Sequence, residues 1–143
     1  MYATNPSIIE IPEGVVTVKS HAGKALEGVK ELKLPSTLEN IASGAFSFME
    51  SLESLELGAN VAYVGEYAFM SAKNCKSLVL NNKLDKIDEG AFSGMRSLEG
   101  TVVIPDNTEV LYGAFDYCGS ANFQYRGTLY TQDNIKSMYH AYS

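Results

Sequence analysis

Cysteine and histidine are the residue types in this chain best suited to nucleophilic catalysis or zinc binding, and the chain holds two of each. Cys75 or Cys118 could supply a thiolate nucleophile, and a histidine close to it could act as the base. The histidines, His21 and His140, lie near opposite ends of the sequence, and neither shares a metal-ligand spacing with a cysteine. We therefore expect no catalytic residue and no metal site.

A cluster of carboxylates is the other candidate for site chemistry. Asp85, Asp88 and Glu89 could gather a calcium ion, but their spacing does not reproduce a calcium-binding loop, and Lys83 and Lys86 lie among them. This mixture of charges is typical of a solvated turn with local ion pairs. We expect no cofactor.

The strongest pattern is a three-residue motif that recurs every 23 residues. A constant period in this range predicts stacked supersecondary units, none of which can bury its own apolar face. The chain is therefore predicted to be a repeat solenoid, mainly β, whose core is shared between neighbouring coils. The four copies are Gly44-Ala45-Phe46, Tyr67-Ala68-Phe69, Gly90-Ala91-Phe92 and Gly113-Ala114-Phe115.

Two apolar ladders with the same period predict two short strands in every coil. A third ladder fails at Asn107, where the earlier coils carry Leu38, Val61 and Leu84. The strand ladders are Leu32, Leu55, Leu78 and Val102, followed by Ile41, Val64, Ile87 and Val110. We number the predicted coils 1 to 5, at about 11–33, 34–56, 57–79, 80–102 and 103–125.

The coil geometry also bears on the cysteines. Cys75 and Cys118 lie two coils apart and in different positions of the repeat. Two coils at roughly 4.8 Å each already exceed the reach of a disulfide. We expect two buried free thiols.

Both ends of the chain are predicted to be caps. The segment 22–29 is rich in helix formers and is expected to hold a helical turn. Residues 126–130 indicate a turn and a closing strand. Asp133 is then a suitable N-cap for a capping helix in the cap region 126–143, with an apolar face of Ile135, Met138, Tyr139 and Tyr142. With no linker-like stretch, residues 1–143 are expected to form one domain.

The repeat is most complete in Leu32-x-Leu34-Pro35-x-x-Leu38-x-x-Ile41-x-x-x-Ala45-Phe46 and in its echo from Ile104-Pro105 to Cys118. These residues resemble the BspA-like leucine-rich repeats of bacterial surface proteins. The resemblance implies a right-handed leucine-rich-repeat solenoid of short parallel strands with tight turns. It also implies a role in adhesion or protein recognition at the cell surface or after secretion. Coil 1 departs from the pattern, because Gly23 stands where the phenylalanine belongs.

Composition narrows the classes of partner. The net charge of −6 argues against nucleic acid and anionic membranes, which both select basic surfaces. The sequence contains no apolar run of the roughly 18 residues that a membrane-spanning helix needs, so no membrane insertion is expected. The first residues, 1–6, lack the features of a signal peptide, so a cytoplasmic chain and a trimmed surface protein both stay open. The oligomeric state is not indicated.

The candidate binding residues are those expected to point outward from the strands and turns. We expect a non-catalytic protein-interaction or adhesion module, with a host or matrix protein among the candidate partners. The alternative is a carbohydrate-binding accessory domain, disfavoured because the chain has no tryptophan and its tyrosines are spread over several coils. An enzyme is the third choice. The candidate residues are Lys33, Glu56, Val79, Val103 and Gln124 on the first strands, and Tyr63 and Tyr112 near the turns.

Overall fold

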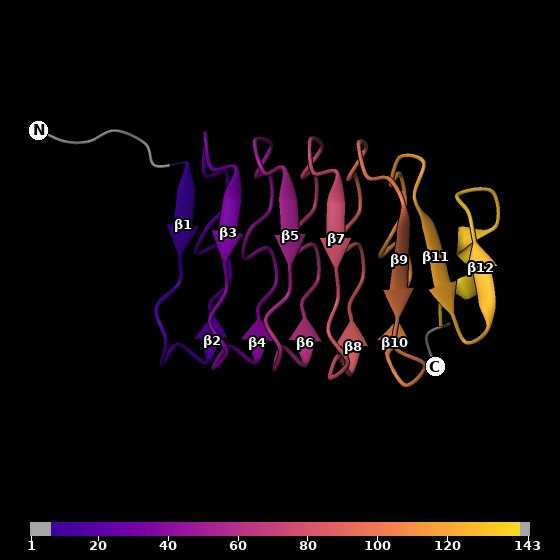
Figure 1. Ribbon diagram of the computed structural model, residues 1–143, viewed down its shortest axis with the longest axis horizontal. Helices are drawn as coiled ribbons and strands as arrows, with labels where there is room; N and C mark the ends of the chain where they lie inside the picture. The colour runs from indigo at the N-terminus through magenta and orange to yellow at the C-terminus, as the bar shows by residue number, and fades with distance from the viewer. Residues whose placement is uncertain (1–6, 141–143) are drawn as a thin grey trace, which may run out of the picture.

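The computed structural model describes residues 7–140, which form a solenoid of short parallel strands with almost no helix (Figure 1). Each coil contributes one strand to a first sheet and a two-residue strand to a second sheet. The predicted mainly-β repeat solenoid is therefore confirmed. The first-sheet strands are β1 (Ile8–Glu10), β3 (Glu31–Lys33), β5 (Ser54–Glu56), β7 (Ser77–Val79), β9 (Thr101–Ile104) and β11 (Asn122–Tyr125). The second-sheet strands are β2 (Thr17–Val18), β4 (Asn40–Ile41), β6 (Tyr63–Val64), β8 (Lys86–Ile87) and β10 (Glu109–Val110).

The first sheet is split in two. Hydrogen bonds join β1-β3-β5-β7, and a separate group joins β9 and β11 to the antiparallel β12 (Thr128–Tyr130). The chain takes four residues from Leu98 to Val102 where coil 3 takes three, and the extra residue falls at Gly100, which has a φ of +78°. This insertion shifts β9 relative to β7, so no ladder forms between the two strands.

The second sheet runs without a break from β2 to β10. Coil 5 is one residue shorter between β9 and β10, which offsets the insertion in coil 4 and restores the register. Because of that deletion, Thr108 takes the buried position that the sequence pattern had shown failing at Asn107. Thr108 is fully buried, and its hydroxyl donates to the Leu84 carbonyl at 2.8 Å. Thr108, whose hydroxyl is hydrogen-bonded, therefore fills the expected gap in the apolar ladder.

A third side of the solenoid is made of turns, and we call it the turn face. Alternate N–H groups of this face donate to carbonyls of the following coil, as Phe46 does to Ala68 at 2.7 Å and Phe48 does to Met70 at 2.8 Å. On this face the backbone adopts positive φ twice in each coil, which glycine tolerates best. The turn face comprises residues 20–25, 43–48, 66–71, 89–94 and 112–117.

The core is built from stacked identical side chains. The rings of Phe46, Phe69, Phe92 and Phe115 lie 5.4 to 5.5 Å apart and are stacked. Phe92 is fully buried between Phe69 and Phe115, as the repeat predicts. The alanine before each phenylalanine is also fully buried, because only a small side chain fits inside the tight turn. Each coil thus covers the apolar face of the one before it.

Coil 1 differs from the expectation at residues 22–29. This segment forms hydrogen-bonded turns, and the predicted helical turn is wrong. Gly23 explains why coil 1 lacks a phenylalanine, because a Cβ atom there would lie 2.4 Å from Cδ1 of Phe46. The ring of Phe46 closes the stack at this end by lying directly over the glycine.

The carboxyl-terminal cap is more strand-like than predicted. The closing strand is present as β12, but the helix is a single 3-10 turn, η1 (Ile135–Met138). Its N-cap is Asn134 and not Asp133, and no side chain caps it. Ile135 and Met138 are buried against the last coil, as predicted, whereas Tyr142 lies outside the described residues. Tyr139 leaves the turn in an extended conformation, which lets His140 form a parallel bridge with Leu111.

The cap also satisfies the last donors of the turn face. The N–H of Phe115 donates to the Tyr139 hydroxyl at 3.0 Å, and the N–H of Tyr117 donates to Oε1 of Gln132 at 3.0 Å. Tyr139 in turn donates to Asp116 Oδ1 at 2.9 Å. Side-chain oxygens therefore stand where the carbonyls of a further coil would lie. Across residues 7–140, no helix has the length and apolarity to cross a bilayer.

Candidate functional site

The outward face of the first sheet holds five of the seven predicted site residues. In β3, β5 and β7 the middle residue is buried and its neighbours face outward, because successive side chains alternate. Parallel pairing in register sets Glu56 beside Val79, and Val103 beside Gln124. The row is therefore continuous within each half of the split sheet. Val79 and Val103, which lie on either side of the split, are 51% and 61% exposed.

Leu129 extends the apolar part of this face. It pairs directly with Gln124 across the antiparallel β11–β12 ladder, so both side chains project from the same face. Leu129 is 54% exposed, comparable to Val79 and Val103. Sequence reasoning predicted the closing strand but missed this residue, because the register of an antiparallel strand is not set by the 23-residue period. The turn at Arg126-Gly127, where both residues have positive φ, is the signal that could have placed it.

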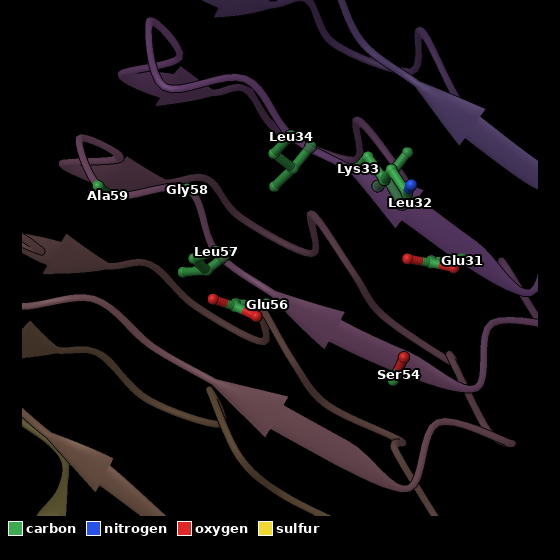
Figure 2. Close-up of a pocket in the computed structure, with 9 residues that line it drawn as sticks. All are labelled: Glu31, Leu32, Lys33, Leu34, Ser54, Glu56, Leu57, Gly58 and Ala59. Carbon is green, nitrogen blue, oxygen red and sulfur yellow. The ribbon is translucent and has the colours of Figure 1, made fainter.

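The amino-terminal half of the same face is polar and hollowed. Figure 2 shows Glu31 and Lys33 from β3 and Ser54 and Glu56 from β5 around a hollow of about 300 Å³. A second hollow of about 410 Å³ shares Glu56 with the first and reaches Val79 and Lys83. The candidate surface thus has a charged half over β3 and β5 and an apolar half over β7, β9 and β12.

The two predicted tyrosines are not part of this surface. Tyr63 is in β6 of the second sheet, and its hydroxyl donates to Asp88 Oδ2 at 2.7 Å. Burial, reinforced by this bond to a carboxylate, raises the pKa of Tyr63 to about 12. Tyr112 belongs to the turn face, where it packs edge-on against Tyr139 and accepts a hydrogen bond from Nζ of Lys136 at 3.2 Å.

The cysteines are placed as small apolar residues. Both are free and fully buried, and each thiol donates to a backbone carbonyl, Cys75 to Ser77 at 3.3 Å and Cys118 to Phe92 at 3.2 Å. Burial raises the pKa of Cys75 to about 11 and that of Cys118 to about 12, so both are neutral thiols near pH 7. A neutral, buried thiol is a poor nucleophile and a poor metal ligand.

Asp88 is already hydrogen-bonded within the protein, and the two histidines lie far from each other. Asp88 accepts hydrogen bonds from Tyr63 and from the N–H of Glu89, which anchors the turn. His140 lies 2.9 Å from the Tyr125 hydroxyl in the cap, whereas His21 is on the turn face of coil 1. Within residues 7–140, no group of three histidine, cysteine or acidic side chains could hold a metal ion.

Comparison with known proteins agrees with this architecture. The structure is similar to the crystal structure of a leucine-rich cell surface protein from Faecalibacterium prausnitzii, with a TM-score of 0.81 and 22% sequence identity. The alignment covers 97% of this chain and 36% of that protein, so the present chain corresponds to about a third of its length. At this identity the likeness shows the fold. No curated protein sequence matches the chain.

The family assignment comes from the repeat itself. Residues 1–122 match the model of the BspA-type leucine-rich repeat region, in six copies. Because the match covers most of the 143 residues, the chain belongs to the BspA-type leucine-rich repeat family.

Proposed function

We propose that this chain is a non-catalytic protein-interaction module that binds its partner across the outward face of the first sheet. The observation that carries the proposal is the exposed apolar row of Val79, Val103 and Leu129. These three aliphatic side chains are about half exposed on β7, β9 and β12 of one face, and exposed apolar patches mark interaction sites.

The charged half of the face supplies the polar rim of the proposed interface. Glu31, Lys33 and Glu56 border the first hollow, and Glu56 also lines the second hollow, which reaches Val79. Gln124 of β11 lies between Val103 and Leu129 and adds a polar group inside the apolar half. Protein interfaces combine an apolar centre with a polar rim in this manner. The strands are tied into a rigid solenoid, so a partner can contact several coils without ordering a loop.

The family supports an adhesive role and a location at the cell surface. BspA-type repeats are of the bacterial surface-protein type, and the similar crystal structure is that of a cell surface protein. The candidate partners are therefore extracellular proteins that contact bacterial cells, including host and matrix proteins. The buried thiols and the unclustered histidines favour binding over catalysis.

The test replaces the apolar centre by charge. Purified matrix proteins and surface proteins of the native host are screened for binding, and the affinity of each identified partner is measured for the parent and for Val79→Glu/Val103→Glu. We expect the double variant to lose at least tenfold in affinity with little change in Tm, because both side chains face solvent. Val16→Glu is the matched control, since Val16 is 46% exposed and lies outside this face.

Two results would count against the proposal. One is a partner that binds the double variant as tightly as the parent, which moves the site to the turns around Tyr63 and Tyr112. The other is loss of binding in Val16→Glu as well, which would show a general effect of added negative charge.

A further inference from the structure

The turn face carries a groove of about 270 Å³ that is separate from the first-sheet surface. Its floor is made by small residues of coil 2, Ser43, Gly44 and Ser47. One wall comes from coil 1, with His21 and Lys24. The other comes from coil 3, with Glu66, Tyr67 and Met70, and Phe48 at the end of the coil 2 turn also lines the groove.

Two aromatic rings lie at equivalent positions of the repeat, two coils apart. The His21 ring covers Gly44, where a Cβ atom would be 2.6 Å from its Cε1, and the Tyr67 ring covers Gly90, where a Cβ atom would be 2.4 Å from its Cε1. Gly44 has no side chain to cover coil 3, so the position between the two rings is empty of protein. Two coils span about 10 Å at the usual strand spacing. A six-membered ring midway would lie about 5 Å from each neighbour, close to the 5.4 Å of the phenylalanine stack.

The groove concentrates backbone strain. His21, Phe48 and Tyr67 have φ values of 61°, 62° and 55°, in the left-handed region. The equivalent positions of coil 4 are glycines, Gly90 and Gly94, which adopt this region without cost. A bulky side chain is strained there, and such strain clusters at binding sites. Of the four ring-bearing residues with positive φ among residues 7–140, three line this groove and Tyr117 does not.

The polar side chains of the groove keep their hydrogen-bonding capacity. Within residues 7–140, the side chains of His21, Lys24, Ser43 and Glu66 form no hydrogen bond or ion pair with protein groups. Lys24 places its ammonium 5.9 Å from the centroid of the Phe48 ring. The groove is therefore lined by aromatic rings on two sides, by the cation of Lys24 and the hydroxyl of Ser43, and by the carboxylate of Glu66.

We propose that this groove binds a neutral hexopyranose unit of a glycan. A sugar ring presents C–H groups to aromatic faces and hydroxyls to charged and hydroxyl side chains, which is what the two walls and the rim provide. An aromatic side chain of a partner protein would leave the four polar groups unsatisfied. An anionic sugar is disfavoured by the net charge of −6. This site is distinct from the first-sheet surface and does not depend on it.

The test uses soluble neutral sugars and variants that keep the backbone. Glucose, galactose, mannose and their neutral disaccharides are titrated into isotope-labelled protein, and the signals of His21, Ser43 and Tyr67 are followed by NMR. Tyr67→Gly and Phe48→Gly remove one aromatic each and place there the residue that coil 4 uses. Tyr117→Gly is the matched control, because Tyr117 also has positive φ, at 59°, and is 65% exposed outside the groove.

We expect saturable shifts at the groove with at least one neutral sugar, a loss of at least tenfold in affinity in Tyr67→Gly, and unchanged affinity in Tyr117→Gly. The first-sheet variant Val79→Glu/Val103→Glu is expected to bind the sugar like the parent. Three results would overturn the proposal: no saturable shift with any neutral sugar, equal affinity in the parent and Tyr67→Gly, or saturation by tyrosinamide or glucuronate while the neutral sugars leave the signals unmoved.

Discussion

The interior coils and the carboxyl-terminal cap satisfy the same backbone donors by different means. In the interior, the N–H of Phe92 donates to the carbonyl of Ala114 in the following coil at 2.8 Å. In the last coil, the N–H of Phe115 donates instead to the Tyr139 hydroxyl, and that of Tyr117 to the Gln132 side chain. Any coil of the repeat can provide the first arrangement, whereas the second depends on particular side chains.

This difference separates two kinds of stability. Interior coils are held by apolar stacking and by backbone bonds that are indifferent to sequence. The cap adds the buried side chains of Ile135 and Met138 to the end of the core, and it also relies on a short network of polar side chains. We therefore expect interior substitutions to act through packing and cap substitutions to act through single hydrogen bonds.

The largest effect is expected for Phe92→Ala. Removing a fully buried ring from the middle of the stack should destabilise the protein by about 3–5 kcal/mol, the range for truncation of buried phenylalanine. Chemical denaturation followed by tyrosine fluorescence or circular dichroism measures it. Phe48→Ala is the control, since Phe48 is 39% exposed on the turn face and should change stability much less. An unchanged midpoint for Phe92→Ala would contradict the stacking of the core.

A smaller effect is expected for Tyr139→Phe in the cap. The substitution keeps the ring but leaves the Phe115 N–H and one Asp116 oxygen without their partner, at a cost of about 1–3 kcal/mol. Amide hydrogen exchange should show faster exchange at Phe115 and unchanged exchange at Phe92. Tyr130→Phe is the control in the cap, because the Tyr130 hydroxyl forms no hydrogen bond with the protein within residues 7–140. Equal loss of protection in both regions would show that the cap and the interior open together.

The labelling rates of the two thiols compare the opening of the interior with the opening of the last coil. Cys75 lies in the interior and Cys118 in the last complete coil, and both should react slowly with a thiol reagent until denaturant is added. In Tyr139→Phe, we expect Cys118 to be labelled faster while Cys75 is unaffected, because opening of the cap uncovers coil 5 first. Mass spectrometry of the labelled protein resolves the two sites. A loss of two hydrogens in the purified monomer would indicate a disulfide and contradict the coil assignment.

The smallest effect is expected from the interior pair of Tyr63 and Asp88. The folded pKa of Tyr63 is raised to about 12 from an ordinary value near 10, so its contribution is complete below pH 10 and is lost as the pH rises to 12. Solvent screens this half-buried pair, and we expect less than about 1 kcal/mol. Comparing the parent with Tyr63→Phe between pH 9 and 12 isolates the effect from the other tyrosines. A constant difference over that range would show that the hydroxyl is not linked to folding.

The repeat period made the interior predictable. Phe92, the buried alanines and the outward position of Val79 all follow once side chains are known to stack at intervals of 23 residues. Translation along one axis determines the neighbours of every residue inside the array. The sequence therefore predicted the core, the strand ladders and most of the first-sheet surface.

Features that depart from the period were not predictable in the same manner. The burial of Thr108 depends on an insertion at Gly100 and a deletion in coil 5 that offset one another, so counting back from Phe115 by the repeat period points to Asn107 instead. The cap was predicted as a helix because its apolar residues have helical spacing, but extended pairing of His140 with Leu111 competes successfully with the helix. The groove depends on which rings lean across to the next coil, and side-chain direction is not encoded by periodicity.

The hydrogen bonds that join neighbouring coils on the turn face all run one way, and they give this face an electrical polarity. In every described coil alternate N–H groups of this face point toward the carboxyl end, as those of Gly44, Phe46 and Phe48 do, so their peptide dipoles add along the face. The carboxyl end of the turn face therefore carries partial positive charge and the amino end partial negative charge. The half-buried carboxylate of Asp116 lies at the positive end, and the ammonium of Lys24 lies at the negative end, where each is electrostatically favoured. Each added coil would lengthen this dipole without changing its direction.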